Sequence, residues 1–165
     1  MRHNTPSADR TKTEEDNSAI YLMTNMIPQA PINNLEIWKN LESYTRRLIQ
    51  AGNEGYVIMG SYRKGGTGSN GSAETIDQGR VTIPKQIWRE IVVLPKGDKD
   101  VSQVTTSTRV IAVNTPNINT INSAWKTYRT TVDAIETATG YILLSELPDN
   151  IEDALVSKVD TGPTN

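Results

Sequence analysis

Three side chains that could do chemistry share one helical stretch of the sequence. Asn34, Glu42 and Arg46 are separated from one another by multiples of four residues, and this spacing predicts that they lie along one side of a helix. An amide, a carboxylate and a guanidinium next to a buried face are suited to holding a hydrated cation and a phosphate. The apolar stripe that would form this buried face consists of Ile37, Leu41, Tyr44 and Leu48.

The same three residues also have ordinary structural roles. Charged side chains are mostly exposed, so the spacing alone is more typical of a solvated helix flank than of a binding site. Asn34 could cap the start of the helix, a role that asparagine favours. Glu42 and Arg46 could form an i,i+4 ion pair, which is worth about 0.2–0.5 kcal/mol. Spacing does not separate these alternatives.

The composition bounds the class of protein. The chain has 165 residues, a net charge of −2, no cysteine and a single histidine, His3. A chain of this length predicts one domain with a single core. The lack of cysteine in the sequence excludes a disulfide framework, a thiolate metal site and a cysteine nucleophile. Because the net charge is small, any binding site for a polyanion has to be a local basic cluster.

A single histidine restricts the catalytic machinery. A Ser-His-Asp triad would need His3 to be buried and braced, and the sequence contains no G-x-S-x-G motif. A zinc site needs several His or Cys ligands. Paired carboxylates of the glycosidase type stay open, although acidic pairs such as Glu14 and Glu15 are typical of solvated helix faces. The chemistry that fits best is Mg²⁺ with oxygen ligands and His3 as the base, which needs one histidine and an amide or carboxylate.

The order of the expected elements predicts an α+β fold with a mostly antiparallel sheet flanked by helices. Short strands that follow one another without long intervening helices favour antiparallel pairing. Strands are expected at 55–60, 80–84, 87–94 and 108–113, with a glycine-rich hairpin connection at 64–79. Helices are expected at 14–21 after Thr13, at 34–52 up to Gly52, at 132–139 between Thr130 or Thr131 and Gly140, and at 151–159 after Asp149 or Asn150.

No linker or internal repeat divides the sequence. Residues 1–159 are therefore expected to form a single domain, and residues 160–165 a disordered tail. The polar N-terminal stretch, which carries His3, would normally fray. No apolar run is long enough to span a bilayer, and the N-terminus lacks the pattern of a signal peptide. The sequence does not predict the oligomeric state or the compartment.

Six segments carry a family resemblance, namely HNTPSADRT at 3–11, DNSAIYLMTNMIPQAP at 16–31, NLESYTRRL at 40–48, VIAVNTPN at 110–117, WKTYRTTVDAIETATGYILLSELP at 125–148 and the closing IEDALVSKVD. They resemble the DNA/RNA non-specific endonuclease family, the ββα-metal or His-Me finger nucleases. The resemblance covers nearly the whole chain, and its TNMIPQAP block is specific. It implies an α+β domain of the ββα-metal type.

The resemblance implies a role for each candidate residue. His3 stands where the family's Asp-Arg-Gly-His motif ends in the base that activates water. Asn34 matches the asparagine that binds Mg²⁺, for which Mn²⁺ can substitute. Glu42 matches the carboxylate that steadies the water shell of the metal, and Arg46 the arginine that contacts the scissile phosphate. The implied reaction is hydrolysis of phosphodiester bonds in DNA and RNA without sequence preference.

The sequence departs from the family pattern at its start. The motif reads Asp-Arg-Gly-His, whereas this chain begins Met1-Arg2-His3, so Met1 stands at the place of the arginine and Arg2 at that of the glycine. Ile32 replaces an aspartate that is common after the PQAP block. Family members carry upstream strands and a further arginine. The chain is therefore expected to be a family member truncated at its active-site motif, with an exposed sheet edge.

Two functions follow from these observations. The first is an endonuclease acting on DNA and RNA, with a rate reduced by weak positioning of His3. The second is a catalytically inactive nuclease-fold remnant that at most binds nucleic acid or a protein partner. A small-molecule hydrolase on the same scaffold has little support in the sequence. Relatives are often secreted, but this chain carries no signal peptide, and no membrane partner is expected.

Overall fold

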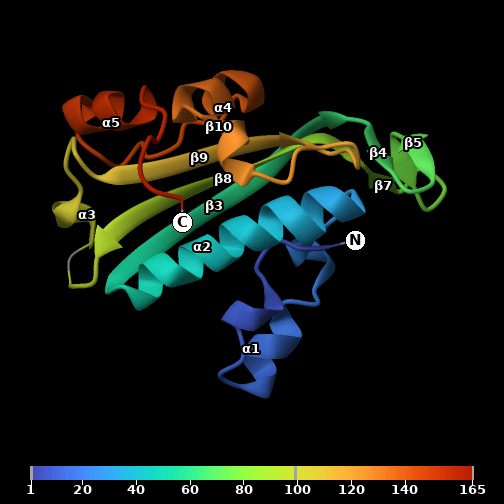
Figure 1. Cartoon of the computed structure of the whole chain (residues 1–165), viewed down its shortest axis with the longest axis horizontal. Helices are drawn as coiled ribbons and strands as arrows, with labels where there is room; N and C mark the ends of the chain where they lie inside the picture. Colours follow the sequence, from blue (N-terminus) through green and yellow to red (C-terminus); the bar gives the residue numbers. More distant parts are fainter. Residues whose placement is uncertain (1, 99, 165) are drawn as a thin grey trace.

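A four-stranded antiparallel sheet forms the centre of the protein (Figure 1). The structure is a computed structural model that describes residues 2–98 and 100–164. The strands are β3 (Asn53–Lys64), β8 (Pro84–Pro95), β9 (Arg109–Pro116) and β10 (Arg129–Thr130). Their order across the sheet is β10–β9–β8–β3, and every neighbouring pair is antiparallel. The predicted α+β fold with a mostly antiparallel sheet is confirmed.

Strand β8 is a central strand and is buried on both faces. Its sequence, PKQIWREIVVLP, is almost continuously apolar, as expected for a strand that is covered on two sides. Successive side chains of a strand point to opposite faces, so Ile91 packs in one core and Val92 in the other. Separate strands were predicted at 80–84 and 87–94. The structure also separates them, since Val81–Thr82 forms the short strand β7, and β8 begins at Pro84 and pairs with β3 along nearly its whole length.

Helix α2 (Lys39–Gln50) covers one face of the sheet (Figure 1). It continues from a π-helical turn, Asn33–Trp38, and the chain leaves it through Gly52, whose φ of 94° is the predicted left-handed cap. The predicted apolar stripe is confirmed, although Leu48 is only partly buried. The buried residues of this core are Ile27, Ile37, Trp38, Leu41, Tyr44, Ile87, Ile91, Ile111, Val113 and Trp125.

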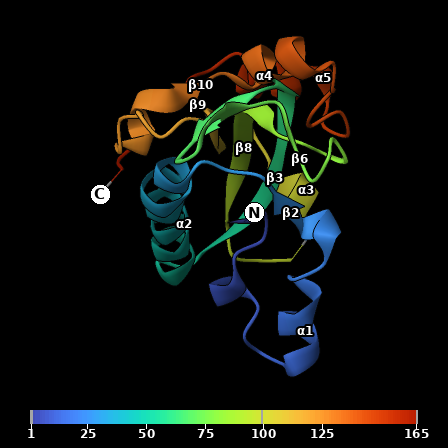
Figure 2. The same ribbon diagram turned by 90° about the vertical axis from the view of Figure 1, so that its right-hand side faces the viewer.

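Helices α4 (Val132–Thr139) and α5 (Asp149–Val156) cover the opposite face (Figure 2). Helix α4 begins as predicted, with the Thr131 hydroxyl accepting a hydrogen bond from the Ala134 N–H at 3.1 Å, and it ends at the left-handed Gly140. The predicted cap of α5 is wrong. The residue before this helix is Pro148, which makes no side-chain cap but has a φ of −57°, close to the helical value.

The segment before α2 forms a small unit next to the sheet (Figure 2). Strand β1 (Arg2–His3) pairs antiparallel with β2 (Met26–Ile27), and helix α1 (Glu14–Ala19) lies between them in sequence. The predicted cap of α1 is confirmed, because the Thr13 hydroxyl accepts from the Asp16 N–H at 3.0 Å. The expected fraying of this end is wrong for His3, since strand pairing holds its backbone.

Side-chain amides attach the PQAP block to the end of β9. The Asn117 amide oxygen accepts from the Ala30 N–H at 2.7 Å, and its nitrogen donates to the Pro28 and Pro84 carbonyls at 3.0 and 2.8 Å. Asn33 donates to the Pro116 carbonyl at 2.6 Å. These bonds satisfy backbone groups that no regular strand pairs, and they determine where the helical stretch starts.

The remaining elements lie at the ends of the sheet. The glycine-rich stretch forms two small hairpins, which confirms the predicted hairpin connection. The elements are β4 (Gly66–Gly68) with β5 (Gly71–Ala73), β6 (Thr75–Ile76) with β7 (Val81–Thr82), α3 (Asp100–Gln103), and the 3₁₀ turns Ser7–Asp9, Met23–Asn25 and Trp125–Tyr128.

The tail that was predicted to be disordered is held against the sheet over residues 160–164. Asp160 is buried and accepts two hydrogen bonds from Arg109, both at 2.8 Å, and a third from Arg129 at 3.2 Å. The Pro163 carbonyl accepts from the Tyr44 hydroxyl and from Arg109. Sequence composition does not show these pairings, because the arginines lie far away along the chain.

Some predictions fall outside what the structure tests. Met1 and Asn165 lie outside the described residues, so the motif position predicted for Met1 and the last residue of the tail are not described. One domain over residues 1–159 stays a prediction. Within the described part of the chain, no helix is long and apolar enough to cross a membrane.

Glu90 is an uncompensated acid in the core beneath α4 and α5. Its side chain is fully buried on β8, and neither carboxyl oxygen has a hydrogen-bond partner among the described residues. Burial, together with the charge of Glu136, raises the pKa of Glu90 to about 7. The folded protein therefore keeps a proton that the unfolded chain releases. Its stability should fall as pH rises from about 4.5 to about 7 and then level off.

Replacing Glu90→Gln tests this pH dependence. The amide does not titrate. The difference in unfolding free energy between the variant and the wild type should therefore shift in favour of the variant by on the order of 3 kcal/mol across this range. Urea unfolding at several pH values measures the difference. The exposed Glu146→Gln variant should follow the wild type throughout. Parallel curves for Glu90→Gln and the wild type would mean that Glu90 is ionised in the folded protein.

Candidate active site

The structure brings the four predicted site residues together around one cavity. His3, Asn34, Glu42 and Arg46 line a pocket of about 260 Å³, which is completed by residues 6–8. They come from β1 and from the helical stretch that runs through the π turn into α2. The helical spacing predicted the grouping of the last three residues. The addition of His3 depends on how the chain folds back.

His3 is held by strand pairing and by an aromatic contact. Its backbone lies opposite Met26 in the β1–β2 ladder, and its side chain is half-buried. The imidazole meets the ring of Tyr21 edge to face, with centroids 4.9 Å apart and planes at 87°. The ring is therefore oriented by its surroundings, although it lies close to the start of the chain.

Asn25 fastens the chain directly after His3. Its backbone carbonyl accepts from the Asn4 N–H at 2.7 Å, and its amide oxygen accepts from the Thr5 N–H at 2.8 Å. The amide nitrogen donates to the carbonyls of Thr5 at 3.3 Å and Ile20 at 2.9 Å. Asn25 belongs to the TNMIPQAP block, so this block positions His3.

Two adjacent asparagines have different environments. The Asn33 amide is fully buried and occupied, since it donates to the Thr115 hydroxyl at 3.1 Å and accepts from Gln29 at 2.7 Å. Among the described residues, the Asn34 side chain makes no hydrogen bond, and it lines the pocket. The Asn34 N–H donates to the Ala30 carbonyl at 3.1 Å. Asn34 therefore lies inside the helical stretch, so the alternative of an N-cap is wrong.

The helix that carries the site was predicted to be α-helical from Asn34, and this prediction is wrong. Asn33–Trp38 is a π-helical turn, in which the hydrogen bonds run from residue i to i+5 and an extra residue is accommodated. In a regular α-helix, Glu42 would be rotated by about 80° relative to Asn34. The π turn offsets part of this rotation, and both side chains reach the same pocket.

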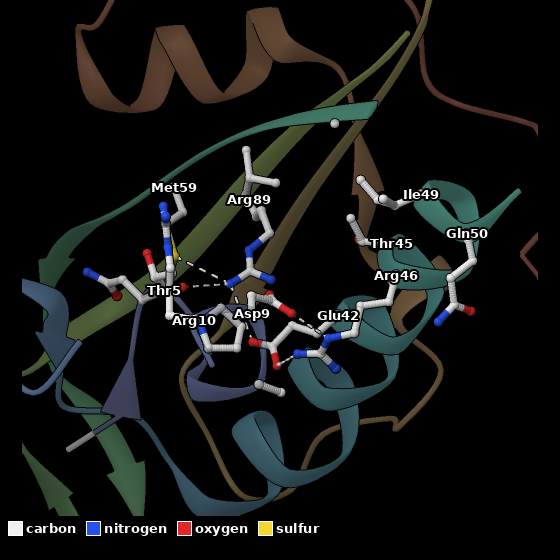
Figure 3. Close-up of a pocket in the computed structure, with 15 residues that line it drawn as sticks. Thr5, Asp9, Arg10, Glu42, Thr45, Arg46, Ile49, Gln50, Met59 and Arg89 are labelled. Carbon is white, nitrogen blue, oxygen red and sulfur yellow. Dashed lines mark hydrogen bonds and ion pairs between the residues drawn. The ribbon is translucent and has the colours of Figure 1, made fainter. Parts of the chain in front are cut away.

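Glu42 lies between two arginines (Figure 3). Its Oε1 is 3.5 Å from Nη2 of Arg89 on β8, and its Oε2 is 3.8 Å from Nη2 of Arg46. Arg46 also donates through Nε to Asp9 at 2.6 Å. The i,i+4 pair considered from the sequence exists, but it belongs to a row of alternating charges. Since only 18% of the Glu42 side chain is exposed, this row is not a solvated flank.

Burial has the largest influence on the acidity of Glu42. Desolvation raises the pKa of Glu42 above its ordinary value, and the charges of Arg89 and Arg46 oppose this shift. The net direction is upward, so desolvation outweighs the two guanidinium groups. Both arginines therefore favour the ionised form of Glu42 against the effect of burial.

A larger cavity of about 600 Å³ adjoins the first (Figure 3). The two cavities share Glu42 and Arg46, and Arg89 and Met59 are among the residues that line the larger one. The guanidinium group of Arg46 thus lies where the cavities meet. An extended anionic molecule could occupy both cavities with a phosphate at this junction.

Two members of the charged row, Arg89 and Asp9, were not predicted from the sequence. Arg89 had a signal, because Arg89 and Glu90 interrupt the apolar run IWREIVVL, and charged groups inside a buried strand need a specific partner. Asp9 had no such signal. It lies in an exposed polar stretch, and its pairing with Arg46 spans 37 residues of sequence.

The pocket fits a hard cation. No group of three or more His, Cys, Asp and Glu side chains forms a metal site in the described parts of the chain. Mg²⁺ does not need one, since it keeps several waters and binds proteins through one or two oxygens. The free Asn34 amide and the Glu42 carboxylate on the same pocket supply such oxygens. This donor set does not suit zinc.

Fold and site together define an α+β protein with a polar pocket that carries side chains of both charges. A single histidine, a free amide and a row of paired charges surround one pocket. The chain belongs to the DNA/RNA non-specific endonuclease family, which residues 3–150 match.

Its relatives include nucleases from bacteria and animals. A nuclease of Nostoc sp. strain PCC 7120 is 46% identical over 158 residues, which cover 96% of this chain and 55% of that protein. The mitochondrial nuclease EXOG of Danio rerio is 26% identical over 94 residues, or 54% of this chain and 27% of that protein. The chain thus spans about half the length of the Nostoc relative.

A solved structure shows the same fold. The chain superposes on one from the crystal structure of the EndoG/EndoGI complex, which concerns the mechanism of EndoG inhibition, with a TM-score of 0.66. The match covers 88% of this chain and 59% of the other, at 18% sequence identity. This likeness supports the α+β architecture described above.

Replacing Asn25→Ala tests whether the TNMIPQAP block positions His3. The variant loses three side-chain hydrogen bonds to the backbone, so residues 3–5 should become more mobile. Amide hydrogen exchange of Asn4 and Thr5 should accelerate, with a fall in unfolding free energy of about 1–3 kcal/mol. The control, Asn122→Ala, removes a similar bond to the Ala124 N–H in a distant loop and should leave exchange at Thr5 unchanged. Unchanged exchange in Asn25→Ala would contradict this role.

Proposed function

We propose that the protein is a Mg²⁺-dependent endonuclease that hydrolyses phosphodiester bonds in DNA and RNA, with Mn²⁺ as a possible substitute. The observation that supports this most directly is the convergence of His3, Asn34, Glu42 and Arg46 on one pocket. The membership of the chain in the DNA/RNA non-specific endonuclease family agrees with it.

The residues have separate roles in this proposal. His3 accepts a proton from the attacking water, a role that its place at the pocket wall allows. Asn34 would hold Mg²⁺ through its amide oxygen, and Glu42 would accept hydrogen bonds from waters bound to the ion. When bound, Mg²⁺ supplies positive charge that stabilises charge developing on the phosphate oxygens.

Arg46 binds the phosphate. Its side chain is one-third exposed, so its guanidinium can reach a ligand while Asp9 and Glu42 keep it at the pocket wall. These proposed contacts involve a phosphate, a metal ion and water, which DNA and RNA share, and none reads a base. This supports action on both nucleic acids without sequence preference.

A second candidate is a nuclease-fold protein that binds nucleic acid or a protein partner without cleaving it. The observation that favours it is that Arg46, the proposed phosphate contact, is already paired with Asp9 and Glu42. Cleavage and binding assays on the same preparation distinguish the two candidates.

The cleavage prediction concerns His3. The purified chain should nick plasmid DNA and degrade RNA in the presence of Mg²⁺ or Mn²⁺, and EDTA should abolish both activities. His3→Ala should lower the rate by about 10²–10⁴-fold, because the general base is lost. Equal rates in the wild type and His3→Ala would point to a contaminating nuclease. Binding without any cleavage would establish the second candidate.

The binding prediction concerns Arg46. In a His3→Ala background without divalent metal, affinity for DNA and RNA should fall as salt rises, since phosphate contacts release counterions. Arg46→Ala should weaken both and reduce the salt slope by about 0.9 for duplex DNA, or one phosphate contact. The matched control is Arg80→Ala, an exposed arginine that pairs with Asp77 in a hairpin. Equal losses for the two variants would show that binding is diffuse.

A further inference from the structure

Arg89 is a charged residue at the centre of the sheet that the proposed chemistry does not use. It lies on β8, between the two cores, and is 4% exposed. Its Cζ lies 4.6 Å from the ring centroid of Trp38, in cation–π geometry, and its Nη2 lies 3.4 Å from the sulfur of Met59. These contacts hold the guanidinium on two sides.

The polar contacts of Arg89 lead to the two halves of the candidate active site. Nη2 is 3.5 Å from the Glu42 carboxylate and donates to the Asn4 carbonyl at 3.2 Å. Glu42 belongs to helix α2, whereas Asn4 directly follows His3. In the described chain, Glu42 is the acid that pairs with this buried charge. One guanidinium therefore connects the helix to the segment that carries the base.

The geometry points to Arg89 as a positioning residue of the active site, which fixes the Glu42 carboxylate relative to the backbone beside His3. This inference rests on the proposed function, because it assigns Arg89 an effect on those two residues. Arg89 does not line the smaller pocket and is not assigned a contact with the reacting atoms.

Such an anchor matters because the other ion pair described between these two segments, Asp9 with Arg46, is partly exposed to solvent. The Asn4 segment is held by loop hydrogen bonds, and Glu42 is otherwise paired with Arg46, which is itself partly exposed. Catalytic groups need to be held to within about 0.5 Å of their working positions. A side chain from a central strand can provide this, since β8 is paired on both sides.

Arg109 offers a matched control on the same face of the sheet. It lies on β9, its Cζ is 5.6 Å from the ring centroid of Tyr44 on α2, and it binds the Asp160 carboxylate. Arg89 and Arg109 thus both lie on strands of the sheet, contact an aromatic ring and pair with a carboxylate. They differ in what they hold, because Arg109 anchors residues 160–164 rather than the active site.

The first experiment uses hydrogen exchange of the metal-free chain. Arg89→Met should accelerate exchange at Asn4 and Thr5, whereas Arg109→Met should accelerate it at Gly162, whose N–H donates to Asp160, and leave Asn4 and Thr5 unchanged. Exchange at Asn4 and Thr5 that is as fast in Arg109→Met as in Arg89→Met would overturn the inference, because general destabilisation would explain both.

The second experiment is a kinetic double-mutant cycle. Arg89→Met should lower kcat by about 10–100-fold, the usual effect of removing a partner that orients a ligand, with little change in KM. In the double variant with Glu42→Gln, kcat should fall by less than the product of the two single-variant reductions, because both substitutions act through one carboxylate. Fully multiplicative losses would overturn the inference.

Arg89→Lys covers the case in which the methionine variant does not fold. Lysine keeps the charge but lacks the planar guanidinium, which packs on the Trp38 ring while its Nη2 reaches Glu42 and Asn4. The unfolding temperature should recover while kcat stays below that of the wild type, and full recovery of kcat would overturn the inference. Hydrogen exchange also separates the two proposals. If the wild type cleaves nothing, but Arg89→Met still accelerates exchange at Asn4, only the proposed function is refuted.

Discussion

The burial of β8 on both faces is the constraint on which the rest of the structure depends. A strand covered on two sides can carry a charged side chain at low cost only where a partner lies directly over it. Arg89 has such a partner in Glu42, so α2 must place this residue over the middle of the sheet. Glu90, on the opposite face, has no such partner among the described residues, and burial raises its pKa to about 7.

Asparagine side chains provide the second organising feature. An amide carries both a donor and an acceptor, so it can replace a neighbouring strand for backbone groups that have no regular partner. Asn25, Asn33 and Asn117 are used in this way, and together they hold the segment that carries His3 and the start of the site helix. Asn34 differs because its amide faces the pocket instead of the backbone, which is why it is the one suited to a ligand.

Elements with a local cause were predictable. The threonine caps of α1 and α4 and the left-handed glycines after α2 and α4 follow from a few neighbouring residues, and all four were predicted from sequence. Errors arose where distant partners decide. The tail is held at Asp160 by hydrogen bonds from Arg109 and Arg129. The π turn forms where the Asn33 amide donates a hydrogen bond to the Thr115 hydroxyl on β9. No local pattern contains either cause.

The sequence by itself determined the family, the α+β class and four of the side chains that line the pocket. Sequence motifs and the helical period indicate these features, and both depend on residues that lie close together along the chain. Only the tertiary structure decided how these side chains meet. It paired His3 with β2 beside the site helix, brought Asn34 and Glu42 to one pocket through a π turn, and placed Arg89 between Glu42 and the Asn4 carbonyl. The physical reason is that buried charges and unpaired backbone groups are satisfied by residues distant in sequence, whose positions are set by the sheet.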